Sequence, residues 1–375
     1  MYRIEYERNG VVYPVLCPVD NVYKIFSGSY HRETNGAGKL TFAVRYHHPS
    51  LLFFRRYEGI VSLYDDWLPL FRARIVDIKT DHFGSCYVEC EGMLAFLNDV
   101  VITPFIFNET HHVIPGDESN SCRYPDFIRE IVIYHNSHYE LMPSHQFTFV
   151  DETHGAYSDI KFTVSSQSYD TAWTNIQTKG LNNIGGYLEV RHTDTENQLV
   201  LRSEITRRST QSIRQGVNLK SLRIGSDGEP FATAIYPISK YTDANGKQQT
   251  IGIYSVNNSI GYVQNDAAVA RYGRIFKYVE YEGISDPSVL KRTAAADLVN
   301  KYLTRPTVYE VEAIDMTNID WAAPLEVDTL VPIISTKPEV NTVEPLNVMD
   351  VDLVNPQNLQ LKFNDSVRSL AGYRR

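Results

Sequence analysis

The chain has 375 residues, of which 43% are apolar and 22% charged, and its formal net charge is −9. This composition is normal for a soluble globular protein, and the length favours about two to four domains. The acidic balance argues against a protein whose main task is to grip nucleic acid or an anionic membrane.

Strand signals dominate residues 1–105. Ile4 and Tyr6 alternate before Asn9-Gly10, a dipeptide typical of a hairpin turn, and further short strands are predicted within GKLTFAVRY and before Asp65. The first residues, MYRIEYERNG, are charged from residue 3, and no apolar run reaches about 18 residues. We therefore expect a small β-barrel or sandwich with neither an export signal nor a membrane-spanning helix.

Residues 68–105 predict a hairpin that is closed by a short helix after Gly92. Cys86 and Cys90 share one face of its second strand, so their Cα atoms are about 13 Å apart at roughly 3.3 Å per residue. A disulfide requires Cα atoms within about 7 Å, and this spacing is not that of a metal site. We expect both cysteines to be core residues. With Cys17 and Cys122 they form a sparse, irregular set, which favours synthesis in a reducing compartment.

Residues 106–205 predict an accessory α+β domain. One helix is expected to start at Pro125 or Asp126, and a second to run from Asp170 to Lys179 and stop at Gly180. Two strands follow, GGYLEVRHT and QLVLRSE, joined by a polar turn at 194–197.

Residues 206–285 return to strands, which we assign to the second barrel or an accessory domain, with a hairpin turn at Asn245-Gly246. A short helix is predicted from Asp266 to Tyr272, ended by Gly273. The clearest helix spans 286–305: Asp286 is its N-cap, Pro287 follows, and one stripe is apolar. That stripe comprises Leu290, Ala294, Leu298 and Tyr302.

Residues 306–375 predict the strands that complete a second barrel. Alternating segments occur at 308–313, before the turn 355–358, and at 359–363. The polar, Pro-containing stretch 335–347 is predicted to be an exposed loop. The fold class is therefore α+β and mainly β, with two small β-barrel-like domains and accessory α+β domains.

One candidate for chemistry is a histidine pair at the end of the first helix of the accessory domain. His135 and His138 form H-x-x-H with Glu140 nearby, which would make the histidines zinc ligands and Glu140 a base. A zincin helix, however, carries H-E-x-x-H, and that pattern is absent. We expect solvated or loop-packing histidines.

Other candidates are weaker. A run of basic residues lies between Glu204 and Asp227, without the interleaved aromatic residues of a single-strand binder, so we favour a solvated face or an inter-subunit contact over a DNA-facing patch. The paired carboxylates Asp65/Asp66 and Asp350/Asp352 lie at predicted turns, which favour Asp for local backbone reasons. The basic run between Glu204 and Asp227 comprises Arg207, Arg208, Arg214, Lys220 and Arg223.

Cys122 with a distant histidine is a conceivable cysteine protease.

Several segments, taken in chain order, resemble one family of phage proteins. The quoted segments are GKLTFAVRYHHP, YDDW, LFRARIVDIKTD, YVECEGMLAFLNDVVITPF, SYDTAWTNIQTKGLNNIGGYLEVR, NLKSLRIGSDGEPFATAIYPIS, DAAVARYGRIFKYVEYEGISDPSVL and LNVMDVDLVNPQNLQLKF. Together they resemble the N-terminal module of phage and prophage tail proteins, the family called tail-associated lysin or prophage tail endopeptidase. The likeness covers most of the chain.

The resemblance implies a tail-hub fold in which two small barrels combine with accessory α+β domains. It also implies a homotrimer, in which six barrels match a distal tail protein hexamer. Such a hub would sit at the distal tip of the virion tail after assembly in the host bacterial cytoplasm. It would contact the receptor-binding proteins and the tape-measure protein, and gate the channel for passing DNA without sequence-specific binding. The resemblance implies neither a cofactor nor a metal.

The chain differs from longer family members in its C-terminal part. Twelve residues follow Phe363 in this sequence, so we expect the wall-degrading extension of those members to be absent. The short form resembles the hubs of lactococcal-type siphophages, and we predict no catalytic residues. The alternatives are a peptidoglycan-degrading tail peptidase that uses His135, His138 or Cys122, and a carbohydrate-binding adhesion module. The 25 tyrosines, on which an adhesion module would depend, are spread along the strands.

Overall fold

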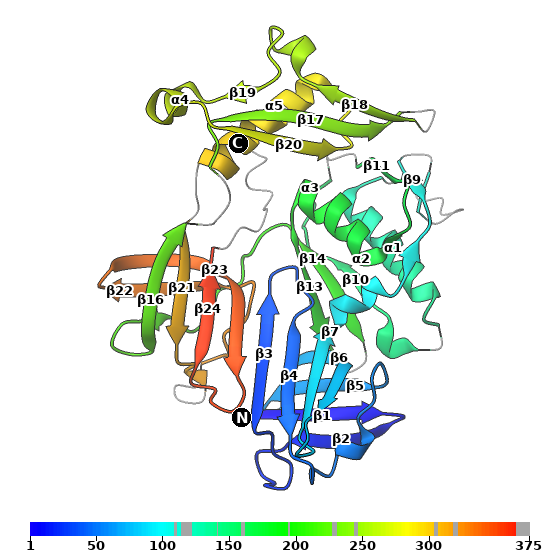
Figure 1. Ribbon diagram of the computed structural model, residues 1–375, viewed down its shortest axis with the longest axis vertical. Helices are drawn as coiled ribbons and strands as arrows, with labels where there is room; N and C mark the ends of the chain where they lie inside the picture. Colours follow the sequence, from blue (N-terminus) through cyan, green and yellow to red (C-terminus); the bar gives the residue numbers. More distant parts are fainter. Residues whose placement is uncertain are drawn as a thin grey trace.

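The structure is a computed structural model that describes residues 1–108, 111–113, 122–140, 142–158, 162–193, 196–226, 231–243, 247–303, 307–317 and 322–364. Three hydrophobic clusters organise these residues. The first holds strands from both ends of the sequence, the second lies between residues 93 and 201, and the third between 232 and 302. Figure 1 shows the three parts, with the third at the top.

The N-terminal strands form one curled sheet, in the order β3-β4-β7-β6-β5-β1-β2. The predicted opening hairpin is confirmed: Asn9 and Gly10 both have positive φ, at 54° and 73°, as a tight hairpin turn requires. The bounds are β1 (Tyr2–Arg8), β2 (Val11–Leu16), β3 (Ser27–Glu33), β4 (Lys39–Val44), β5 (Ile60–Asp65), β6 (Leu68–Thr80) and β7 (Cys86–Gly92), with a 3₁₀ turn, η1 (Leu51–Phe53), before β5.

The predicted hairpin of residues 68–92 is confirmed as β6 and β7. Cys86 and Cys90 are 1% and 0% exposed and lie in the first hydrophobic cluster, as expected for core residues. The helix predicted after Gly92 is a 3₁₀ helix, η2 (Met93–Asn98), rather than an α-helix. Five of its six side chains are buried, so packing rather than α-helical hydrogen bonding determines this segment.

The C-terminal strands continue the same sheet. The order runs β16-β21-β24-β23-β3, so β23 pairs with β3 and joins the two ends of the chain. Leu359, Leu361 and Phe363 face the core, as their alternation predicts. The bounds are β15 (Ile213–Arg214), β16 (Leu219–Ser226), β21 (Thr307–Ala313), β22 (Leu330–Thr336), β23 (Glu339–Asp352) and β24 (Leu359–Phe363).

The loop predicted for residues 335–347 is wrong. These residues form the end of β22, a two-residue turn and the first half of β23, which pair as a hairpin. The polar composition misled the prediction because one face of this hairpin is solvated, and only Val340 and Leu346 are buried in the part of β23 before Asn347.

Two separate barrels are not observed as such. The N-terminal and C-terminal strands share one 13-stranded sheet and one hydrophobic cluster, which contains Ile4 and Phe363 alike. Figure 1 shows this sheet curling from β22 and β16 across β3 to β1 and β2. The architecture is mainly β with a large curled half-barrel, and the domain boundaries 1–105, 106–205, 206–285, 286–305 and 306–375 remain a prediction.

The middle part packs helices against a three-stranded sheet, β10-β14-β13. The first predicted helix is confirmed as α1 (Tyr124–Ser137), with Pro125 in its first turn. The second begins at Ala172, two residues after the predicted Asp170, and continues past Gly180 to Ile184, which precedes Gly185 with its φ of 90°; residues 176–181 are π-helical. The other bounds are β8 (Val101–Ile102), β9 (Phe105–Phe107), η3 (Pro143–His145), β10 (Thr148–Asp151), β11 (Val164–Ser166), β12 (Asp170–Thr171), α2 (Ala172–Asn175), η4 (Ile176–Leu181), α3 (Asn182–Ile184), β13 (Tyr187–His192) and β14 (Asn197–Arg202).

The third part is a four-stranded sheet with one long helix on one face. The predicted helices are confirmed as α4 (Asp266–Tyr272) and α5 (Pro287–Asp297), and Asp286 caps α5 by accepting a bond from the Ser288 N–H at 2.7 Å. The predicted apolar stripe of α5 and the π-helical turns after it is buried. The bounds are β17 (Ala234–Thr242), β18 (Gln248–Gly252), η5 (Tyr254–Val256), β19 (Val263–Gln264), β20 (Phe276–Glu282) and η6 (Leu298–Leu303).

The predicted turn Asn245-Gly246 and the first two residues of the turn predicted at 194–197 lie outside the described residues. Among the residues that are described, no helix has both the length and the hydropathy to cross a membrane.

Candidate assembly interface

The 13-stranded sheet ends in strands that pair on one side only. Within the described ranges, β16 pairs with β21, and β2 pairs with β1. Apolar side chains are partly exposed at both ends: Ile224 is 44% exposed, and Val11 and Val12 are each 49% exposed. Free edge strands offer backbone hydrogen-bonding groups to another chain, so these two edges are candidate assembly surfaces.

A charged contact crosses the seam between β3 and β23. The protonated His31 ring donates from Nδ1 to Asp350 Oδ1 at 2.6 Å, and its Nε2 lies 3.8 Å from a Glu33 carboxylate oxygen. Glu33 and Asp350 together raise the pKa of His31 to about 9, although partial burial opposes them. The imidazolium is therefore the neutral-pH form, and it bridges the two ends of the sequence.

A half-buried ionic cluster lies where the middle part meets this seam. Arg202 donates to Glu189 at 2.8 and 3.2 Å and to Glu152 at 2.9 Å. Burial opposes ionisation of Glu189, but the bond from Arg202 outweighs it and lowers the pKa of Glu189. Nearby, the Thr34 hydroxyl donates to Asp328 at 2.6 Å, and burial raises the pKa of Asp328 to about 6.

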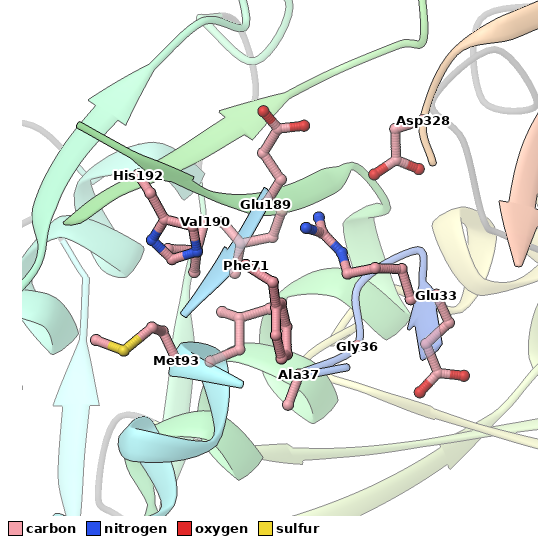
Figure 2. A pocket seen from close by; sticks show the side chains of 12 residues that line it. Glu33, Gly36, Ala37, Phe71, Met93, Glu189, Val190, His192 and Asp328 are labelled. Atoms are coloured by element: carbon pink, nitrogen blue, oxygen red, sulfur yellow. The ribbon is translucent and has the colours of Figure 1, made fainter. Parts of the chain in front are cut away.

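Figure 2 shows a small pocket at this junction. Its polar lining includes Glu189, His192 and Asp328, and each of these side chains is bonded to the protein. His192 accepts the Arg72 backbone N–H at Nε2 and is 3.4 Å from Asn197 Oδ1 at Nδ1. Burial, with the nearby arginines, lowers the pKa of His192 to about 3, so this ring is neutral. The pocket therefore lies at the contact between the three-stranded sheet and the large sheet, and its polar side chains are hydrogen-bonded within the protein.

A close backbone contact at Gly92 lies beside this pocket. A Cβ added to Gly92 would lie 1.9 Å from the Ala37 carbonyl oxygen and 2.6 Å from the Phe71 ring. Only glycine allows the backbones of β7 and the β3–β4 loop to approach this closely.

The two histidines at the end of α1, His135 and His138, differ in burial. His135 is fully buried and its Nε2 bonds the His145 carbonyl at 3.1 Å, whereas His138 is exposed and bonds the Tyr134 carbonyl at 2.9 Å. Burial lowers the pKa of His135. Glu140 is exposed. Across the described part of the chain, no group of three His, Cys, Asp or Glu side chains could hold a metal ion.

The other residues that were candidates for chemistry lie far apart and make structural contacts. Cys122 is 7% exposed and lies in the second hydrophobic cluster. Asp65 and Asp66 both bind the Met1 amino group, at 2.8 and 2.6 Å. Asp352 accepts the Val354 and Asn355 backbone N–H groups, as expected of a turn residue.

The predicted basic run is divided among several contacts. Arg207 pairs with Glu326 at 2.7 Å, and Lys220 donates to Asn358 and to the Gln357 carbonyl. Arg214 donates to Ser212, while Arg208 and Arg223 lie exposed on the surface. The absence of catalytic, cofactor and metal residues stays a prediction.

Sequence analysis missed one surface feature. Tyr236, Tyr262, Phe276 and Tyr278 gather on one face of the third part, whereas the tyrosines were predicted to be spread out. A signal existed in FKYVEYE, since Phe276 and Tyr278 occupy the face opposite Val279 and Tyr281.

Comparison with known proteins supports the family resemblance. Residues 206–373 match the sequence profile of the family described as prophage endopeptidase tail. No curated protein sequence matches the chain.

The fold is shared with solved tail proteins over nearly the whole chain. The 43 kDa tail protein of prophage MuSo2 from Shewanella oneidensis is 12% identical, with 99% of each chain covered and a TM-score of 0.63. A tail protein from Neisseria meningitidis is 9% identical, with 96% of each covered and a TM-score of 0.64. The c3393 protein of E. coli, a type VI secretion component described as similar to T4 tail proteins gp27 and gp5, is 9% identical, with 97% of this chain and 79% of that one covered and a TM-score of 0.50. The predicted resemblance to prophage tail proteins is confirmed.

Proposed function

We propose, on the premise of this shared prophage-tail fold, that the chain is a structural hub of a phage tail tip or baseplate. The observation that carries the proposal is the agreement between the family match over residues 206–373 and a fold similarity that covers 99% of this chain. Such a hub would function through burial of surface between subunits, which requires no reactive side chain.

The proposed assembly is a homotrimer at the distal tip of the virion tail. The curled sheet supports this proposal because β2 and β16 each pair with one strand only in the described part of the chain, and neighbours arranged around an axis would cover their other edges. The proposed partners are a distal tail protein hexamer, receptor-binding proteins and the tape-measure protein. Gating of passing DNA belongs to the same proposal, as does assembly in the host bacterial cytoplasm.

Two measurements test the proposal. Light scattering of the purified chain at micromolar concentration should give the mass of three copies, and gold-labelled antibody to this chain should decorate the tail tip of virions in electron micrographs. A monomer at this concentration, or label along the tail tube or on the capsid, would contradict the hub assignment.

A peptidoglycan peptidase is the second candidate, because the matching family is described as an endopeptidase. A zymogram on host cell wall separates the two functions. The hub proposal expects no clearing. Clearing that is lost in His135→Ala or Cys122→Ala, with an unchanged circular dichroism spectrum, would establish the enzyme instead.

A further inference from the structure

The sheet of the third part has one covered and one uncovered face. Ile235, Val279 and Tyr281 lie in the hydrophobic cluster with Leu290 of α5, which covers their side of the sheet. The residues that alternate with them point the other way. We call the uncovered set the aromatic face; it comprises Tyr236, Tyr254, Tyr262, Phe276 and Tyr278.

The aromatic face is contiguous. The rings of Tyr236, Tyr262 and Phe276 lie with centroids 5.1 to 5.3 Å apart, and Tyr236 is the register partner of Tyr278. Tyr254 is close to Tyr236, because a Cβ added at Gly261 would lie 3.5 Å from one ring and 3.4 Å from the other.

These side chains are well exposed for aromatic residues. Tyr254 is 63% exposed, Tyr278 56%, Phe276 46% and Tyr236 41%. At roughly 200 Å² for a fully exposed large aromatic side chain, their exposed area is roughly 400 Å². An apolar patch of this size is within the range of the largest patch on a typical monomeric protein, and such patches are often functional.

The border of the aromatic face includes one ion pair and one arginine. Lys240 pairs with Glu280 at 2.6 Å, and Arg274 donates to the uncharged Gln264 at 2.9 Å while its guanidinium lies 5.7 Å from the Tyr262 ring centroid. Aromatic residues with a rim arginine are typical of protein–protein interfaces, whereas nucleic-acid binding depends on several cations along the face.

The neighbouring strand edge favours a polypeptide over a glycan. Within the described ranges β20 pairs only with β17, so the backbone groups on its other edge adjoin Phe276 and Tyr278. A protein chain can cover the rings and also satisfy these backbone groups, whereas a sugar chain offers no matching ladder.

We propose that the aromatic face binds a second copy of this chain and forms one of the subunit contacts of the assembly. This inference rests on the proposed trimer and names a surface for it. The exposed area is about half of the roughly 800 Å² that each partner contributes to a standard interface. The face alone is therefore too small for a stable dimer, but it suffices as one of several contacts in a closed ring that also covers the edges of the large sheet.

A matched pair of substitutions tests this inference. Phe276→Glu places a charge on the aromatic face, and Phe83→Glu places the same charge on a phenylalanine that is 71% exposed in the β6–β7 turn. We expect Phe276→Glu to raise the dissociation constant of the oligomer at least tenfold in sedimentation experiments, with Phe83→Glu unchanged. An oligomer that is equally stable in both variants overturns the inference and leaves the hub proposal intact, whereas a monomeric wild type overturns both.

A second measurement avoids dependence on the folding of a variant. A photo-crosslinking phenylalanine analogue at position 278, in the otherwise unchanged chain, should give a covalent dimer band, with the crosslink mapped to a second copy by mass spectrometry; the same analogue at position 83 should not. Exclusive crosslinks to another tail protein, or crosslinking only to added cell-wall polysaccharide, would overturn the inference.

Discussion

His31 of β3 and Asp350 of β23 share a 2.6 Å charged hydrogen bond across residues that are 319 positions apart in the sequence. The contact lies on the one strand pair that joins the N-terminal and C-terminal strands of the large sheet. The contribution of this hydrogen bond to the stability of the β3–β23 strand pair can therefore be tested by mutation.

Asp350→Asn should weaken the seam in a pH-dependent way. The folded pKa of His31 is raised to about 9, so the stabilisation is fully present below the ordinary histidine pKa of about 6.5 and is lost as pH rises through 9. Urea unfolding midpoints of wild type and variant should differ at pH 6 and converge by pH 10. The effect is small because both side chains are partly exposed. Glu339→Gln, an exposed change on the same strand, is the control, and a constant difference across pH would contradict the assignment.

Asp328→Asn should remove a second loss of stability with rising pH, at lower pH than that of His31. The folded pKa of Asp328 is raised to about 6, so protonation stabilises the fold, and this stabilisation is lost as pH rises from about 4 through 6. The amide keeps an oxygen for Thr34 and tolerates the φ of 62°. We expect the variant to match or exceed wild type at pH 7.5, by up to about 2 kcal/mol, and to lose the slope between pH 4 and 6.

The alanine variant at the same position provides the contrast. Asp328→Ala removes the acceptor for Thr34 and places a residue ill-suited to positive φ there, so it should be less stable than Asp328→Asn at every pH. Equal stabilities of the two variants would show that neither the bond nor the backbone conformation matters.

Gly92→Ala should destabilise the chain severely, because the added Cβ would meet the Ala37 carbonyl oxygen at 1.9 Å. Backbone cannot move aside as a side-chain tip can, so we expect a loss of several kcal/mol or no soluble protein. Gly225→Ala is a matched strand control with nothing within 4 Å of its added Cβ, and its thermal midpoint should change little. A mild effect of Gly92→Ala would contradict the close approach.

Leu290→Ala should destabilise the third part by about 2–5 kcal/mol, since Leu290 is fully buried between α5 and the sheet and leaves a cavity. Val299→Ala, at a side chain that is 44% exposed, should stay within about 0.5 kcal/mol of wild type. Hydrogen exchange of β17 amides reports this part of the molecule directly, and unchanged protection in Leu290→Ala would refute the role of this contact.

Local chemistry made some elements predictable. Asn9-Gly10 specifies a tight turn wherever it occurs between strands, and Asp286-Pro287 specifies a helix start, so both were predicted correctly. The alternation around Cys86 and Cys90 likewise needed no tertiary information.

Elements that depend on distant partners were not predictable. The hairpin of 330–345 carries prolines and polar residues on its solvated face, and only pairing with neighbouring strands distinguishes it from a loop. The 3₁₀ form of residues 93–98 and the π-helical turns of 176–181 are set by packing, which the hydrophobic period cannot resolve. The aromatic face was missed because its members come from two strands, one 3₁₀ turn and one loop that are separated in the sequence.

The β3–β23 pairing has a consequence for biosynthesis. At roughly 5–20 residues per second, the ribosome delivers β23 some 15–60 seconds after β3. During that interval β3 can pair with β4, but its other edge is uncovered and the core is incomplete, which favours aggregation and chaperone binding. Completion of this sheet therefore has to wait for the synthesis of distant residues, and the yield of the protein in a cell should depend on the protection of the incomplete sheet during that time.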